Sequence, residues 1–166
     1  MTVVGTGVNA YKTRDLVNDY QNWQDETSWY AHSGYRDAME LAYLALGITG
    51  EGGEFADQAK KLLRKHGDEA MTFASDEELL KLAYELSDVQ WYVVRTCTML
   101  GITPYELILI NLVKLYKRIN EREESGLGEI EWPLKDLPFP DALKLTRHIE
   151  SRITSPSASQ STDTDT

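Results

Sequence analysis

Two short acidic motifs, Glu51-Gly-Gly-Glu54 and Glu85-Leu-Ser-Asp88, are the parts of this 166-residue chain best suited to chemistry. In each motif the two acids are three residues apart, so on an α-helix they project from the same face. Two such helices side by side would present an all-oxygen ligand set, which favours Mg²⁺, or Mn²⁺ as a substitute, over zinc or copper. The sequence therefore predicts a magnesium site formed by Glu51, Glu54, Glu85 and Asp88.

The context of the second motif supports this prediction more than its spacing does, because acids three residues apart recur elsewhere in the chain. Between Leu79 and Val94 the sequence LLKLAYELSDVQWYVV is apolar nearly all the way round a helix, and such a helix is normally buried. Buried carboxylates without partners cost several kcal/mol each. The alternative to a metal is an ordinary salt bridge to Lys81 or to Arg95, and for this motif alone the two interpretations are equally good.

Glycines surround the first motif, in the sequence GITGEGGE. Each costs about 1 kcal/mol relative to alanine inside a helix, so their presence needs a reason. Gly47, Gly50 and Gly53 would thin the helix and allow a close neighbour or a bulky ligand. The alternative for Glu51 and Glu54 is a solvated acidic face.

Several cationic and amide side chains complement the acids. Lys61 lies two turns beyond Glu54, and three further polar residues fall near one face of the apolar segment YELILINLVKLYKR: Asn111, Lys114 and Arg118. Lysine as a point charge and arginine as a fork both suit phosphate oxygens. The alternative is snorkelling, in which the stems are buried and the charged ends reach water, and it is strongest for Lys117 and Arg118 near the end of a helix.

Helical periodicity recurs in four segments and no run alternates as a strand would, so we predict an all-α bundle of about four main helices. Gly67 and Gly101 are typical helix ends, and Ser75 with Glu78 and Thr103 with Glu106 are typical helix starts. The expected ranges are Thr13–Tyr30, Tyr35–His66, Ser75–Leu100 and Thr103–Arg122, with a short amphipathic piece at Asp141–Ile153.

We expect residues 1–122 to form the helical catalytic domain, with its core at about 35–122. Residues 123–153 are expected to be a partly extended C-terminal extension, and 154–166 a disordered tail. The formal charge of −10 argues against a nucleic-acid partner. The lack of a membrane-length apolar stretch or signal peptide, together with the lone Cys97, which we expect to be a buried thiol, predicts a cytoplasmic protein with no membrane partner.

The two acidic motifs, the aromatic pair Trp91-Tyr92, the turn Leu100 to Ile102 and the pattern Asn111-x-x-Lys114 together resemble the MazG family of all-α nucleotide pyrophosphohydrolases. The resemblance covers about Leu41 to Arg118. There are two departures: Gly50 stands where many members have a second glutamate, and the stretch between the motifs is long, which predicts an inserted loop at MTFASDEE.

The resemblance implies Mg²⁺-dependent hydrolysis of a nucleoside triphosphate, with deoxynucleotides favoured, to the monophosphate and pyrophosphate. Glu54 would orient or deprotonate the attacking water, although a role as metal ligand fits nearly as well. Trp23 or Trp29 would stack on the base, although a core position is the better expectation for each. Phosphate oxygens would meet Lys61, Asn111, Lys114 and Arg118.

Helices this apolar are expected to pack as a homodimer or homotetramer (a dimer of dimers), and the resemblance implies the same. Two other functions remain open. One is a non-catalytic helical interaction module in which the acids form a structural metal or salt-bridge cluster. The other is a narrower dUTP or dCTP diphosphatase.

Overall fold

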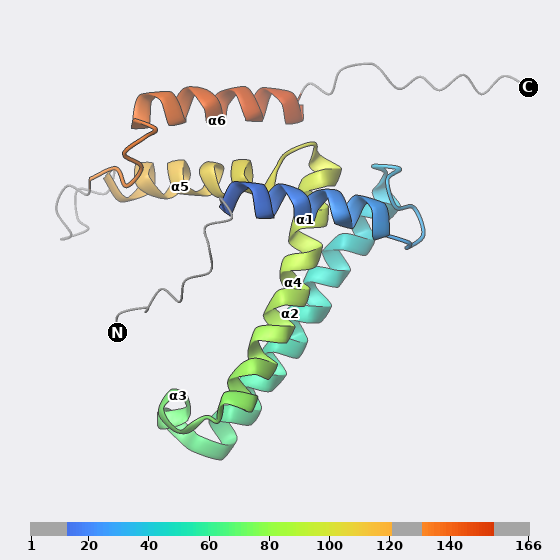
Figure 1. The fold of residues 1–166 in the computed structure, drawn as a ribbon, viewed down its shortest axis with the longest axis vertical. Coiled ribbons are helices and arrows are strands. Elements are labelled where there is room, and N and C mark those ends of the chain that lie inside the picture. Colours follow the sequence, from blue (N-terminus) through green and yellow to red (C-terminus); the bar gives the residue numbers. More distant parts are fainter. Residues whose placement is uncertain (1–12, 121–130, 155–166) are drawn as a thin grey trace, which may run out of the picture. The chain divides into compact units, whose positions relative to one another are not determined.

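The computed structural model describes residues 13–120 and 131–154, and side chains from residue 16 onward. Within these ranges the chain is all helix and turn with no strand, which confirms the predicted all-α class (Figure 1). The helices, in chain order, are α1 (Thr13–Thr27), α2 (Ala38–His66), the short 3₁₀ turn η1 (Gly67–Glu69), α3 (Ala70–Phe73), α4 (Asp76–Leu100), α5 (Pro104–Asn120) and α6 (Phe139–Thr154).

The predicted helix signals are present. Ser75 and Glu78 form the reciprocal capping box at the start of α4, with Ser75 N donating to Glu78 Oε2 at 2.9 Å. Thr103 and Glu106 do the same at α5. Gly67, with φ +60°, follows the last residue of α2, and glycine adopts such a positive φ without strain.

Three expectations for the helices are wrong. α1 ends at Thr27 rather than at Tyr30. α2 begins at Ala38 rather than at Tyr35, because the Asp37 side chain caps it by accepting from Glu40 N. The sequence MTFASDEE is not an inserted loop, since its first three residues belong to α3 and its last three begin α4.

The chain divides into two compact units, residues 18–99 and residues 100–166 with 1–17, and each is described by itself. In the first unit α2 and α4 lie side by side and antiparallel (Figure 1). Tyr92 of α4 packs on Gly47 of α2, and Lys65 near the end of α2 pairs with Glu78 near the start of α4 at 2.8 Å. This antiparallel pairing brings the middle of each helix opposite the middle of the other.

In the second unit α5 packs against α6, which confirms the short amphipathic piece expected at Asp141–Ile153. Their shared core consists of Leu109, Val113, Ala142 and Ile149, each no more than 2% exposed. The described residues do not test the predicted domain limits at 122 and 153, which remain predictions.

No single helix among the described ranges is long and apolar enough to cross a membrane, and α4 and α5 meet the length and composition only when they are taken together. The predicted tail, 154–166, lies outside the described residues apart from Thr154, which is the last residue of α6.

Candidate metal centre

The two acidic motifs meet where α2 and α4 face each other. Each of Glu51, Glu54 and Glu85 offers a carboxylate oxygen, and these oxygens all lie within 4.8 Å of one another. Asp88 is not part of that group of three, but its charge acts on Glu51. The spacing expected from the sequence therefore holds in space, because one turn of α2 and one turn of α4 bring their acids to the same place.

Like charge and burial act together at Glu51. Partial burial of the carboxyl raises the pKa of Glu51, and the charges of Glu54, Asp88 and Glu85 raise it further. Gln58, one turn beyond Glu54 on α2, places its side-chain nitrogen 3.5 Å from Glu85 Oε1. A group of acids that oppose one another's ionisation is suited to a divalent cation.

The salt-bridge alternative is wrong for the second motif. Lys81 pairs with Glu77 at 2.8 Å, and Arg95 pairs with Asp25 and Glu40. Within the described part of the chain, no lysine, arginine or histidine forms an ion pair with Glu51, Glu54, Glu85 or Asp88. The charge of the cluster is therefore not neutralised by these residues.

The burial expected for the second motif is also wrong. Leu80, Tyr84 and Leu86 of α4 are 49%, 59% and 54% exposed, and Asp88 is exposed, while Glu85 is half-buried. The first half of α4, which carries Leu80, Tyr84 and Leu86, has α2 along one side (Figure 1), so its all-round apolar sequence leaves these large side chains exposed. The carboxylates are accordingly accessible to an ion or a substrate.

The glycines of α2 separate into two kinds. A Cβ on Gly47 would lie 2.1 Å from Tyr92 Cε1, so Gly47 permits the close approach that the sequence suggested. A Cβ on Gly50 or Gly53 would meet nothing within 4 Å, so no neighbouring protein atom explains these two. Gly50 directly precedes Glu51, and Gly53 directly precedes Glu54.

The predicted phosphate ligands are divided between the two units, and each group is described within its own unit. Lys61 is on α2, where its ammonium is 3.0 Å from Asp57, and it lines a cavity of about 200 Å³ together with Gln58 and Lys81. Lys60 and Lys61 lower the pKa of Asp57 to about 2, so Asp57 belongs with these lysines and not with the acidic cluster. Lys114 and Arg118 belong to the second unit and line a groove between α5 and α6, and Asn111 is exposed on α5.

The expectation that Trp23 and Trp29 are core residues is wrong. Trp23 is 55% exposed and Trp29 is 90% exposed. Cys97 is buried, as expected.

Comparison with known proteins finds a phage protein that is similar to this chain. No protein-family model and no solved structure matches the chain. The chain is similar to the Gene 37 protein of Mycobacterium phage L5, with 33% identity over 114 residues, which is 68% of this chain and 96% of that protein. The chain belongs to the Gene 37 protein family. The name of this relative denotes a gene and no activity.

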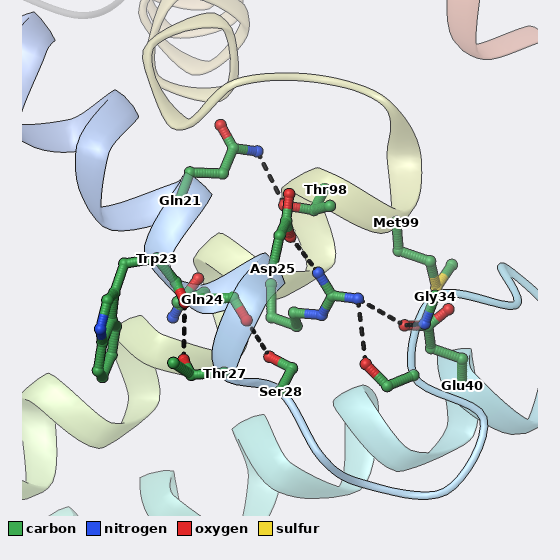
Figure 2. Close-up of polar contacts among 12 residues, drawn as sticks. Gln21, Trp23, Gln24, Asp25, Thr27, Ser28, Gly34, Glu40, Thr98 and Met99 are labelled. Atoms are coloured by element: carbon green, nitrogen blue, oxygen red, sulfur yellow. Dashed lines mark hydrogen bonds and ion pairs between the residues drawn. The ribbon is translucent and has the colours of Figure 1, made fainter.

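This member of the Gene 37 family also has a buried polar network that the sequence analysis did not find (Figure 2). Arg95 of α4 is 4% exposed and contacts Glu40, which is fully buried on α2, at 3.3 Å. Arg95 also pairs with Asp25 of α1 and donates to the Tyr30 hydroxyl at 2.9 Å. A signal was present in the sequence, since an arginine stands in the apolar run WYVVRTCTML, but its partners come from distant parts of the chain.

Burial raises the pKa of Glu40, but hydrogen bonds from Gly34 N, Arg36 N and Tyr30 together with the charge of Arg95 outweigh it, and the pKa is lowered overall. The Gly34 and Arg36 bonds are 2.9 and 2.7 Å long. Glu40 is thus fully satisfied, and its network fixes the segment between α1 and α2.

Proposed function

We propose that this protein hydrolyses nucleoside triphosphates, deoxynucleotides in particular, to the nucleoside monophosphate and pyrophosphate in the presence of Mg²⁺. The observation that carries the proposal is the group of three carboxylates, Glu51, Glu54 and Glu85, whose oxygens lie within 4.8 Å of one another with no cationic side chain of the described residues paired to them. The resemblance of the two acidic motifs to the MazG family supports the choice of substrate.

The donor set fits Mg²⁺. It consists of carboxylate oxygens alone, with Asp88 as the fourth member, and Mg²⁺ is a hard cation that prefers oxygen ligands. The raised pKa of Glu51 also fits, because burial and mutual repulsion of the acids are relieved when a cation binds. Bound Mg²⁺ would supply a water of lowered pKa and neutralise charge on the phosphates.

Glu54 is the group we assign to the attacking water. It is exposed on α2 beside the other acids, and the described residues include no cation paired with it. A carboxylate in this position can orient the water and take its proton. The water oxygen then forms a bond to the α-phosphorus, the bond from that phosphorus to the bridging oxygen breaks, and pyrophosphate leaves with the bonding electrons.

Lys61 is the phosphate contact that the geometry supports best. It lies on the same helix as Glu54, and Gln58 lies beside both the cavity of Lys61 and the carboxylate of Glu85. Its ion pair with Asp57 is exposed, and exposed pairs contribute at most about 1 kcal/mol, so a phosphate can displace it. The phosphate-binding roles of Asn111, Lys114 and Arg118 remain predictions.

The test is a panel of the eight common NTPs and dNTPs, together with dUTP, in the presence of Mg²⁺, assayed for pyrophosphate and monophosphate. We expect release of both from at least one nucleotide, a loss of about 100-fold or more in Glu54→Gln, and little change in Glu69→Gln. Glu69 is an exposed acid of η1, and its substitution makes the same change of charge away from the cluster.

Pyrophosphate release no greater than in Glu54→Gln would contradict the hydrolase proposal and favour the non-catalytic module. Release from dUTP or dCTP alone would narrow the activity to a diphosphatase for that nucleotide. The base that gives the highest kcat/KM then identifies the preferred substrate.

A further inference from the structure

Four cationic side chains surround the groove between α5 and α6 in the second unit. Three lie within little more than one turn of α5, and the fourth is on α6: Lys114, Lys117, Arg118 and Arg147. The groove has a volume of about 560 Å³ and an apolar floor that includes Ile110, Val113 and Leu143. Such a concentration of positive charge is unexpected on a chain with a formal charge of −10.

These cations form no ion pair with the described residues. The ion pairs of the second unit are Lys144 with Asp141 and Arg152 with Glu106, and neither involves the four groove residues. Glu150 lines the same groove but forms no ion pair within the described ranges. Like charges three or four residues apart destabilise a helix by a few tenths of a kcal/mol, so the cluster has a cost that a bound anion would remove.

Ordinary helix chemistry explains part of this arrangement. Lys117 and Arg118 lie in the last turn of α5, where cations interact favourably with the helix dipole. It does not explain Lys114, one turn earlier, or Arg147, which lies in the middle of α6 and faces the same groove. Two helices therefore direct cations at one cavity, and only one of them has a terminus there.

We propose that the α5–α6 groove binds a polyphosphate group, that is, a small anion with two or more linked phosphates. Among the described residues that line the groove, four cations face the single carboxylate of Glu150, which leaves an excess of three positive charges. One phosphate group carries a charge of about −1.5 to −2, so two are needed to balance this excess. Arginine and lysine together provide fork and point-charge contacts to phosphate oxygens.

This inference does not depend on the proposed hydrolysis, because the groove is formed by α5 and α6 alone and needs no metal. The experiment is titration calorimetry of the full chain with inorganic pyrophosphate in EDTA, which keeps the carboxylates of the first unit free of metal. We expect saturable binding that weakens with rising salt. Arg147→Gln should weaken it about tenfold, which corresponds to about 1.4 kcal/mol.

Lys144→Gln is the matched control, because it removes one positive charge from the same helix at a residue that pairs with Asp141 and does not line the groove. Its affinity should stay within about twofold of the parent chain. Equal weakening by the two substitutions, or no pyrophosphate binding in EDTA, would overturn the proposal. Lys117→Gln, which should weaken binding as Arg147→Gln does, keeps the test decisive if Arg147→Gln fails to fold.

Three further ligands identify the source of the phosphates. Tripolyphosphate binding as tightly as a nucleoside triphosphate would support recognition of the phosphate chain alone, whereas tighter binding of the nucleotide would support an added role of the apolar floor. Orthophosphate binding as tightly as pyrophosphate would overturn the requirement for two linked phosphates. Adding pyrophosphate should change the chemical shifts of the Arg147 Nε–Hε group and leave those of the Lys144 side chain unchanged. This result would place the ligand in the groove.

Discussion

Helix α2 carries a glutamate at each of two contacts with α4, and the pKa values of these two glutamates are shifted in opposite directions. Glu40 on α2 is fully buried and has Arg95 of α4 beside it at 3.3 Å, and its pKa is lowered. Glu51, about three turns later on α2, has three acids around it, and its pKa is raised. Both lie at contacts between α2 and α4, so burial against a neighbouring helix does not decide the difference.

The difference lies in where the counter-charge comes from. At Glu40 the fold supplies an arginine, a tyrosine and two backbone N–H groups, so the site is complete without a ligand. At Glu51 no such cation is supplied by the described residues, and two lysines of the same helices, Lys61 and Lys81, pair with Asp57 and Glu77. The charge of Glu40 is neutralised by the protein itself. The negative charge of the group around Glu51 is not neutralised by the described residues, and a bound cation would neutralise it.

The largest loss of stability should follow from breaking the buried ion pairs of Arg95. Arg95→Met leaves Glu40 and Asp25 without their cation, and removing one partner of a buried pair costs about 3–5 kcal/mol of the free energy of unfolding. Chemical denaturation measures it. Lys81→Met, which breaks the exposed pair with Glu77, should cost less than about 1 kcal/mol. Similar losses in the two variants would contradict the distinction between the two sites.

The next effect concerns the incomplete site. Mg²⁺ at 100 times its Kd should stabilise the folded chain by about 2.7 kcal/mol and raise the Tm by roughly 5–10 °C, because it binds the four acids only when they are assembled. Asp88→Asn should reduce this rise, measured by thermal denaturation with and without Mg²⁺. The exposed Asp136→Asn should leave it unchanged. An undiminished rise in Asp88→Asn would remove Asp88 from the site.

The contact between the two sites gives a smaller effect. Gly47→Ala places a methyl group against the Tyr92 ring, which is held between Tyr43 and Trp91, and overpacking of this kind costs about 1–3 kcal/mol. Gly50→Ala, where a Cβ meets nothing, should instead stabilise the chain by about 1 kcal/mol through helix propensity. Urea denaturation measures the change in the free energy of unfolding, which should have opposite signs in the two variants. Stabilisation by Gly47→Ala would show that Tyr92 does not require the glycine.

The smallest effect is a pH dependence at Glu51. A carboxyl whose pKa is raised in the folded chain destabilises the fold when it is ionised, and the penalty is relieved as pH falls through the raised pKa. In EDTA at pH 7, Glu51→Gln should therefore stabilise the chain by a few tenths of a kcal/mol. The gain should shrink as pH falls toward 4, as measured by denaturation at each pH. A gain that does not change with pH would rule out repulsion as its cause.

The sequence predicted the helices well because their signals are local. The capping boxes at Ser75 and Thr103 and the terminal glycine at Gly67 each act within one turn of the chain, so the sequence contains all that they need. The pairing of the two acidic motifs was also predictable, since spacing fixes the face of a helix and two motifs of like type indicate a shared ligand. The start of α2 was less predictable, because the turn before it depends on hydrogen bonds from Gly34 N and Arg36 N to the buried carboxylate of Glu40.

The burial of α4 was predicted wrongly for a related reason. An apolar helix is covered only if neighbours exist on every side, and in this chain α4 keeps Leu80, Tyr84 and Leu86 open. Those side chains are where the predicted homodimer would find its apolar surface, and the oligomeric state remains a prediction. The groove between α5 and α6 was not foreseen either, because Arg147 is 29 residues beyond Arg118 and nothing local relates them.

The sequence by itself determined the helices, the helical face on which each acid lies and the chemical character of the acidic cluster. Only the tertiary structure decided which charges are neutralised, because ion pairing depends on distances between residues far apart in the chain. Arg95 follows Asp88 by seven residues, and its charge goes instead to Asp25 and Glu40. The four carboxylates form no ion pair with the described residues, because the cations near them in the sequence pair with other acids.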